Sequence, residues 1–202
     1  MNVRLAPKYV VLDDFLPDEL VSSLDQHVRK NSHALDLLEL EGSPGSGGYS
    51  ASRKLWMLRD GLGPFEERFC AAVADRAPVL CAGTGVAPFE VARVETKVCA
   101  QRFGSYFGKH VDTDTGEDRP LDSDRMISAV YYFPREPITF SGGELVLYDF
   151  TGKIASAQVA PRRNRLVAFP SSAYHEVTPL VPTDDTLDGA RWSVSCWLHR
   201  AR

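Results

Sequence analysis

The sequence has no apolar run long enough to cross a membrane, since a spanning helix needs about 20 consecutive, mainly apolar residues. Residues 1–7 carry one positive charge and no apolar segment, which is not the pattern of a secretion signal. We therefore expect a cytoplasmic protein that does not insert into a membrane.

Cysteines are few, and no two of them form a CxxC pair. The four are Cys70, Cys81, Cys99 and Cys196. Their wide spacing argues against a zinc ribbon and favours reduced, mostly buried thiols over disulfides.

An excess of basic charge is also absent, because 23 lysines and arginines stand against 27 acidic residues, for a formal net charge of −4. No basic stripe suggests a nucleic-acid partner. The short cluster at 162–165 (RRNR) suits a solvated turn better than a contact with an acidic partner.

The composition is that of one compact domain, with 44% hydrophobic and 10% aromatic residues in 202. We predict a single domain over 1–202, with a helical layer at about 1–88 and a strand-rich core at about 89–202. Within the first part, 9–12 and 52–58 suit strands, and helices are expected at 17–30 and from Pro64 to just before the loop at 82–85.

The second part is rich in short segments of Val, Tyr, Phe and Trp, separated by Gly, Pro and Asp. Strands are predicted at 89–101, 105–110, 126–133, 143–149, 154–159, 164–169, 174–180 and 190–198. Their number matches the roughly eight strands of a double-sheet jelly roll. The predicted fold class is therefore mainly β with flanking helices (α+β), a double-stranded β-helix core covered by N-terminal helices.

A metal site is suggested by His110 and Asp112 at a strand end, together with the distant His175. Two histidines and one carboxylate form the facial triad that holds ferrous iron and leaves positions open for other ligands. An HxD pair alone is weak evidence, and Asp114 is a rival ligand to Asp112. The loop at 113–124 is expected to be solvated and to lie over the mouth of the site.

A co-substrate site is suggested by Arg191 and Ser193, which share one face of the last predicted strand with Ser195. A guanidinium binds a carboxylate in bidentate fashion, and a serine hydroxyl adds a hydrogen bond. Tyr132 is a further candidate to bind the same carboxylate, although a plain core tyrosine explains it almost as well.

Motifs over most of the chain match one known family. They are LPDE at 16–19, FGS at 103–105 before HVD at 110–112, RMISAVYYF at 125–133, GGEL at 142–145, FPSSAYHEVTP at 169–179 and RWSVSCW at 191–197. Together they resemble the Fe(II)- and 2-oxoglutarate-dependent dioxygenases of the prolyl 4-hydroxylase type, most closely the bacterial and fungal branch that includes ribosomal-protein prolyl hydroxylases.

The resemblance implies that His110, Asp112 and His175 bind Fe(II) and that Arg191 and Tyr132 bind 2-oxoglutarate. It implies hydroxylation of an unactivated C–H with O2, release of succinate and CO2, and ascorbate as a possible reductant. The substrate would be a prolyl or other amino-acid residue in a protein, a peptide or a small molecule. Its identity and the oligomeric state are left open.

Two departures from the family bear on the substrate. Phe103 stands where many relatives have tyrosine. The segment from His175 to Arg191 is longer than in some relatives, and 181–189 forms an acidic excursion within it. Two other functions are compatible with the residues. One is a non-catalytic, cupin-like module that binds a metal or small acid, and the other is a zinc hydrolase, which leaves Arg191 unexplained.

Overall fold

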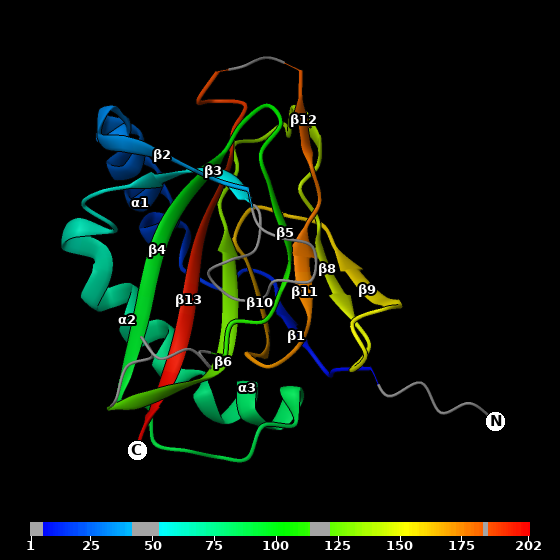
Figure 1. Ribbon diagram of the computed structural model, residues 1–202. Coiled ribbons are helices and arrows are strands. Elements are labelled where there is room, and N and C mark those ends of the chain that lie inside the picture. Colours follow the sequence, from blue (N-terminus) through cyan, green and yellow to red (C-terminus); the bar gives the residue numbers. More distant parts are fainter. Residues whose placement is uncertain (1–5, 42–52, 114–121, 184–185) are drawn as a thin grey trace.

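The computed structural model of the protein describes residues 6–41, 53–113, 122–183 and 186–202 (Figure 1). Residues 41–50 are rich in glycine and serine, which predicts a loop, and apart from Glu41 they lie outside these ranges. Most of the loop at 113–124 lies outside them too. Asp114, the rival metal ligand, is also outside them.

Helices and short 3-10 turns come from the first part of the chain. They are α1 (Asp18–Lys30), η1 (Ser32–Ala34), η3 (Gly63–Phe65), α2 (Glu66–Asp75) and α3 (Ala77–Thr84). Pro17 precedes α1, and Asp18 and Glu19 occupy its first turn, where acidic side chains suit the positive end of the helix dipole.

The helices pack through the apolar stripes that their spacing predicts. The buried residues of α1 are Leu20, Val21, Leu24 and Val28, and those of α2 are Phe69 and Val73. The second helix was predicted to end before residue 82, but α3 continues to Thr84. It ends at Gly85, whose φ of 76° gives the left-handed turn that closes a helix.

Most strands join one curled sheet, in the order β1-β10-β6-β13-β4-β3-β5-β11-β8-β9, with β2 beside β3. A second, two-stranded sheet pairs β12 with β7. The strands are β1 (Val10–Leu12), β2 (Leu35–Leu40), β3 (Arg53–Leu58), β4 (Arg93–Gln101), β5 (Tyr106–His110), β6 (Ser123–Tyr132), β7 (Phe140–Gly142), β8 (Leu145–Tyr148), β9 (Ala155–Val159), β10 (Arg165–Pro170), β11 (His175–Val177), β12 (Leu180–Pro182) and β13 (Arg191–Ala201).

The sheet has a core on each face. The larger core lies between the helices and the strands β4, β13, β6 and β10, as Figure 1 shows for α2 beside β4. The smaller core lies inside the roll and contains Tyr132, Leu145, Leu147, Val167 and Phe169. This double-sheet arrangement confirms the predicted mainly β, jelly-roll fold class.

Several details differ from the prediction. Within the first 88 residues, β1 and β3 match the strands expected at 9–12 and 52–58, but β2 was not predicted and joins the sheet beside β3. The strand expected at 174–180 is two strands, β11 and β12, separated by Thr178 and Pro179. A proline has no N–H to donate to a strand ladder, so the pairing breaks there.

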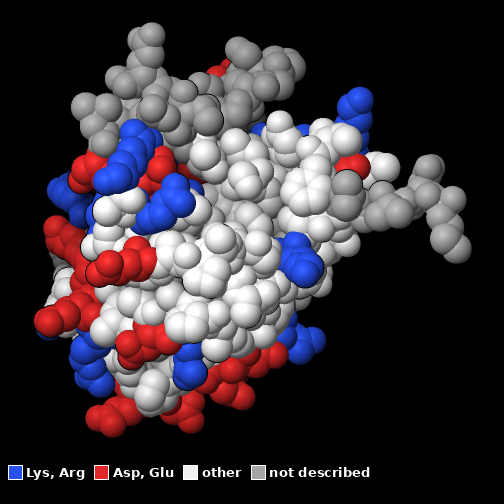
Figure 2. All heavy atoms as spheres, turned by 90° about the horizontal axis from the view of Figure 1, so that it is seen from below, with Lys and Arg blue, Asp and Glu red and all other residues white. Residues whose placement is uncertain are grey.

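Charged side chains are mixed on the face shown in Figure 2, where lysines and arginines lie among the acidic residues. The longest described helix, α1, has 13 residues. Among the described residues no helix is both long and apolar enough to span a bilayer.

Candidate metal centre and co-substrate site

His110, Asp112 and His175 come together although the two histidines are 65 positions apart in the sequence. His110 ends β5 and His175 begins β11, and the antiparallel pairing of these strands sets the two residues opposite each other. Asp112 follows β5 after one residue. One ligand atom from each residue lies within 4.8 Å of the others, which is the separation of donors around a single metal ion.

Hydrogen bonds fix the orientation of both imidazoles. Nδ1 of His110 lies 2.8 Å from the carbonyl oxygen of Gly108, and Nδ1 of His175 lies 3.0 Å from that of Ala173. A carbonyl only accepts, so each Nδ1 carries a proton, and Nε2 is the ring nitrogen that is available to a metal. Both Nε2 atoms lie 3.4 Å from oxygens of Asp112, so three donors face a common centre.

Ser128 and Ser171 hold Asp112 in position, the first through the carboxylate and the second through the backbone. The hydroxyl of Ser128 donates to Oδ2 of Asp112 at 2.7 Å, and Ser171 lies 3.0 Å from Ser128. The backbone N–H of Asp112 also donates to the carbonyl of Ser171 at 2.8 Å. Such outer contacts orient a metal ligand and tune its basicity.

The protonation states at the site suit metal binding. Burial alone would raise the pKa of Asp112, but His175 and His110, with the Ser128 hydrogen bond, lower it overall. Burial and the neighbouring His110 lower the pKa of His175 to about 4, against the opposing effect of Asp112. At neutral pH the acid is therefore ionised and His175 is neutral, the forms that coordinate a metal.

Aromatic rings enclose the two histidines. Phe107 stacks on His110 with ring centroids 3.8 Å apart, and Phe169 lies 4.6 Å from His175. Both histidines are buried, at 3% and 5% exposure. The site therefore limits the access of water to the donors.

A second polar group lies in the interior around Arg191, the first residue of β13, which is 2% exposed. Its Nη1 donates to Oε1 of Gln101 and to the hydroxyl of Ser193 at 3.3 Å, and its guanidinium lies 4.7 Å from the ring centroid of Tyr132. Burial raises the pKa of Tyr132, and the charge of Arg191 opposes that effect.

Several polar atoms of this group have no hydrogen-bond partner among the described residues. They are Nε and Nη2 of Arg191 and the hydroxyl of Tyr132. Arg191 also makes no ion pair within the described part of the chain. A buried guanidinium is costly unless an anion accompanies it, and its free donors match the geometry of a carboxylate.

Glycine makes room for this arginine. Gly143 has a φ of +70°, and a Cβ there would lie 2.7 Å from Cδ of Arg191. A larger residue would therefore displace the arginine stem. The second glycine of the GGEL motif is thus required for steric reasons, because only glycine leaves room for Arg191.

The metal group and the arginine group are linked through the interior of the roll. Tyr132 and Phe169 belong to the same buried cluster, and Phe169 touches His175. Across β11 and β8, His175 also pairs with Leu147 of that cluster. Tyr132 and Phe169 therefore connect the arginine group to His175 through the interior of the roll.

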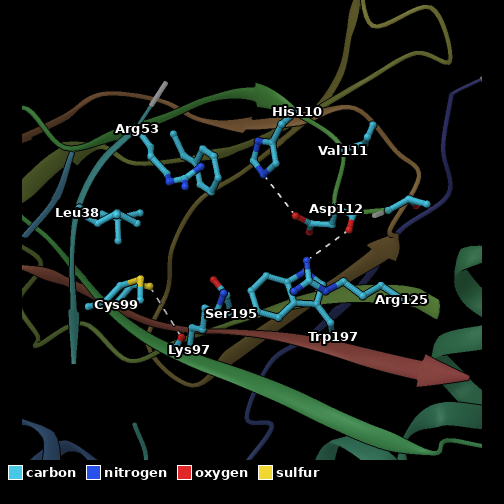
Figure 3. Close-up of a pocket in the computed structure, with 14 residues that line it drawn as sticks. Leu38, Arg53, Lys97, Cys99, His110, Val111, Asp112, Arg125, Ser195 and Trp197 are labelled. Atoms are coloured by element: carbon cyan, nitrogen blue, oxygen red, sulfur yellow. Dashed lines mark hydrogen bonds and ion pairs between the residues drawn. The ribbon is translucent and has the colours of Figure 1, made fainter. Parts of the chain in front are cut away.

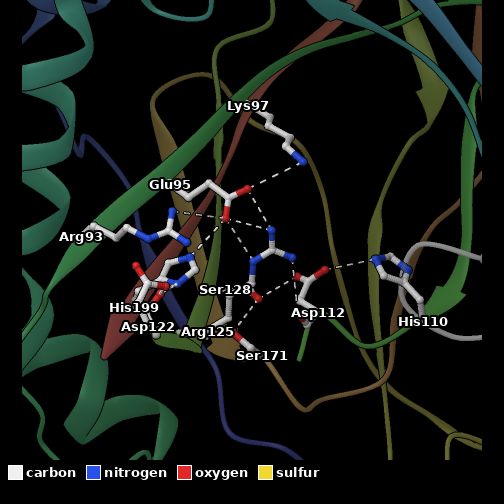
Figure 4. A network of polar contacts seen from close by, with 11 residues as sticks. Arg93, Glu95, Lys97, His110, Asp112, Asp122, Arg125, Ser128, Ser171 and His199 are labelled. Carbon is white, nitrogen blue, oxygen red and sulfur yellow. Dashed lines mark hydrogen bonds and ion pairs between the residues drawn. The ribbon is translucent and has the colours of Figure 1, made fainter. Parts of the chain in front are cut away.

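A charged network supports the metal group from the side of β4 and β6 (Figure 4). Arg125 binds both carboxylate oxygens of Glu95 through Nη2 at 2.8 Å, and its Nη1 lies 3.5 Å from the carbonyl of Asp112. Nε2 of His199 donates to Oε2 of Glu95 at 3.1 Å, because a carboxylate only accepts, and His199 is 1% exposed. The tail position of His199 in the sequence gave no sign of this burial.

Sequence reasoning missed four of these contacts. Gln101 faces Arg191 only because β4 and β13 pair in this register. Ser128 precedes Tyr132 by four residues on the same strand, so period-2 alternation places both on one face and was a usable signal. Ser171 and Glu95 had no local signal.

Known proteins share sequence and fold with this chain. The sequence model of the 2OG-Fe(II) oxygenase superfamily matches residues 96–199. The chain belongs to this superfamily. The matched residues include all six candidate site residues named above.

Curated relatives of this oxygenase are PKHD-type hydroxylases. An uncharacterized one from Synechocystis sp. is 32% identical over 135 residues, covering 63% of this chain and 43% of the relative. One from Shewanella baltica is 33% identical over 96 residues, covering 48% of this chain and 38% of the relative. The chain thus spans less than half the length of these relatives.

Solved structures share the fold of this oxygenase. A Pseudomonas putida prolyl-4-hydroxylase aligns with a TM-score of 0.63 and 21% identity, over 96% of this chain and 93% of that one. A Trichoplax adhaerens prolyl hydroxylase, solved with a hypoxia inducible factor peptide fragment, aligns with a TM-score of 0.60 and 18% identity, over 98% and 84%. At these identities the likeness concerns the fold.

Proposed function

We propose that this protein is an Fe(II)- and 2-oxoglutarate-dependent dioxygenase that hydroxylates an unactivated C–H bond of a prolyl or other amino-acid residue. The observation that carries the proposal is the convergence of two imidazole Nε2 atoms and one carboxylate within 4.8 Å. The family membership supports it, and the prolyl hydroxylases among its structural neighbours supply the substrate class.

In this proposal His110, Asp112 and His175 hold the iron. Arg191 and Tyr132, with Ser193, bind the carboxylate of 2-oxoglutarate that lies away from the metal. Once bound, iron and 2-oxoglutarate supply oxidative chemistry that uses O2 and yields succinate, CO2 and a hydroxylated product.

The chain itself positions the reactants and excludes water. Ser128 and the carbonyls of Gly108 and Ala173 keep the three donors aligned, and Phe107 and Phe169 shield them. Electrostatic interactions are stronger in such a dry site, so a small number of aligned groups is sufficient.

Ascorbate as reductant and a cytoplasmic location belong to the same proposal. The four cysteines are free, which fits a reducing compartment. If ascorbate keeps the iron reduced, omitting it will shorten the linear phase of succinate formation, and adding it back will restore that phase.

Turnover tests the proposal directly. The purified protein is incubated in air with Fe(II), 2-oxoglutarate and ascorbate, and succinate is measured with and without a lysate fraction searched by mass spectrometry for products that gain one oxygen atom. His175→Ala should abolish succinate formation, because it removes a metal ligand.

The matched control is His33→Ala, since His33 is exposed and distant in sequence from the site. Equal succinate formation by His175→Ala and the wild type would refute the ligand assignment. Metal binding without any succinate formation in the wild type would favour the non-catalytic, cupin-like alternative.

A further inference from the structure

A cavity of about 110 Å³ opens beside the metal group (Figure 3). His110 and Asp112 form one side of it, and strands β3, β4, β5 and β13 supply most of the rest. Arg191 and Tyr132 do not line it. The cavity is therefore a space next to the proposed metal ligands and separate from the proposed 2-oxoglutarate carboxylate site.

Apolar side chains form most of the cavity wall. They are Leu38, Leu55, Met57, Phe107, Val111 and Trp197. A cavity of about 150 Å³ in an engineered protein holds one benzene molecule, so this one suits an apolar group no larger than a small ring.

Three basic side chains also line the cavity: Arg53, Lys97 and Arg125. The one acidic lining residue among those described is Asp112, which the proposed function assigns to the metal. Glu95 lies behind the wall and offsets part of this charge, since it pairs with Arg125 at 2.8 Å and with Lys97 at 3.7 Å. Among the described lining residues three are basic and one is acidic, and any divalent metal would add positive charge of its own.

The basic groups lie over the aromatic parts of the wall. Arg53 lies 5.4 Å from the ring centroid of Phe107, which stacks on His110. Lys97 lies 5.4 Å and Arg125 4.3 Å from the ring centroid of Trp197. Cation–π contacts of this kind hold a charged group against an apolar surface. One ligand can therefore contact the positive charge and the apolar wall at the same time.

We propose that the substrate presents a small apolar group to the metal and carries a carboxylate that Arg53 and Lys97 bind. The proposal rests on the proposed function and adds the substrate class. A cationic substrate would be repelled by this lining, and a neutral one would gain nothing from it. The carboxylate belongs either to the reacting small molecule itself or to an acidic residue beside the target in a peptide.

Binding of matched acid and amide probes tests this. The protein is saturated with Mn(II) and 2-oxoglutarate under nitrogen, so that the proposed co-substrate site is filled, and titrations are followed by tryptophan fluorescence because Trp197 lines the cavity. The small-molecule pair is cyclopentanecarboxylate and cyclopentanecarboxamide. The peptide pair is acetyl-Pro-Glu-amide and acetyl-Pro-Gln-amide.

We expect the acid of at least one pair to bind roughly 10-fold more tightly than its amide, as a hydrogen bond to a charged group allows. The pair that shows the preference identifies the source of the carboxylate. Arg53→Met and Lys97→Met should each reduce the preference several-fold. Lys54→Met is the matched control, since Lys54 neighbours Arg53 on β3, does not line the cavity and pairs with Glu39 at 3.6 Å.

Equal binding of acid and amide in both pairs, or no binding of any probe, would overturn the proposal. So would an acid preference that survives the double variant of Arg53 and Lys97. Failure of the proposed function is a different result: the acid preference and its loss in the variants would be found, but no succinate would form with Fe(II) in air.

Discussion

The two faces of β13 perform different tasks. Trp192, Val194, Cys196 and Leu198 point into the core beneath the helices and are buried in apolar contacts. The alternate residues Arg191, Ser193 and Ser195 face the inside of the roll, where polar atoms without partners occur. One strand thus separates a face that stabilises the fold from a face that we propose binds ligands, and substitutions on the two faces should affect different measurements.

The largest effect is expected at the metal group on the inner side. Asp112→Asn keeps the shape of the side chain but removes its charge, so metal affinity should fall by more than the roughly 10- to 100-fold that outer contacts contribute, and succinate formation should stop. Mn(II) binding followed by electron paramagnetic resonance measures this. Asp36→Asn is the control, since Asp36 is exposed and pairs with Arg59 on the surface; an equal loss in both variants would contradict the assignment.

The next largest effect is expected on the free energy of unfolding, for a substitution on the face of β13 that packs under the helices. Leu198→Ala removes a side chain that is 0% exposed, so the free energy of unfolding should fall by about 2–5 kcal/mol. Chemical denaturation measures the change, and the KM for 2-oxoglutarate should stay as in the wild type. Val181→Ala, at a position 55% exposed, should leave stability nearly unchanged. A large rise in KM in Leu198→Ala would show that the two faces are not independent.

Arg191→Met should raise the KM for 2-oxoglutarate, which Leu198→Ala leaves unchanged. Loss of a buried partner to a carboxylate weakens binding by several kcal/mol, so the KM for 2-oxoglutarate should rise by roughly 100-fold. The kcat at saturating 2-oxoglutarate should change much less, because the metal ligands are intact. Arg191→Lys should restore part of the affinity, since it returns the charge without the planar fork. An unchanged KM in Arg191→Met would mean that another residue binds the carboxylate.

Ser128→Ala should produce a smaller loss. Its hydroxyl donates to Asp112 at 2.7 Å, so its removal should lower metal affinity by roughly 10-fold and leave the protein folded. Competition between Mn(II) and a chelator measures the affinity. Ser156→Ala is a suitable control, because Ser156 donates to the backbone of β8 away from the metal group. Identical affinities in all three proteins would remove Ser128 from the site.

The smallest effect concerns acid stability at the edge of the inner face. Burial opposes ionisation of Glu95, but His199 and Arg125 lower its pKa to about 2, from an unfolded value of 4.5. The stabilisation is therefore present above pH 4.5 and is lost as the pH falls towards 2. Its size is about 1 kcal/mol once solvent screening is allowed for.

Glu95→Gln should accordingly flatten the decline in stability between pH 4.5 and 2, measured by thermal unfolding across that range. Glu90→Gln, at an exposed position, is the control and should follow the wild type. If the stability of Glu95→Gln declined with pH as that of the wild type does, groups other than Glu95 would be responsible for the acid sensitivity.

Local patterns in the sequence predicted much of the fold. Leu20, Leu24 and Val28 follow a helical period, and the alternation of 191–198 separates the two faces of β13, so these elements required no knowledge of distant contacts. The helix end was misplaced because a glycine inside 82–85 stops a helix only where the chain adopts a positive φ, as Gly85 does. The two strands at β11 and β12 were merged because the effect of Pro179 depends on which ladder it would join.

By itself, the sequence determined which residues could bind a metal or a carboxylate: two histidines, an acid and an arginine. These residues lie in motifs that resemble those of one oxygenase family. Tertiary structure alone decided that His110 meets His175, that Gln101 and Gly143 hold Arg191, and that Arg53 and Lys97 line a cavity beside the metal group. The physical reason is that strand register and sheet curvature arise from contacts among residues far apart in the chain, and no local pattern encodes them.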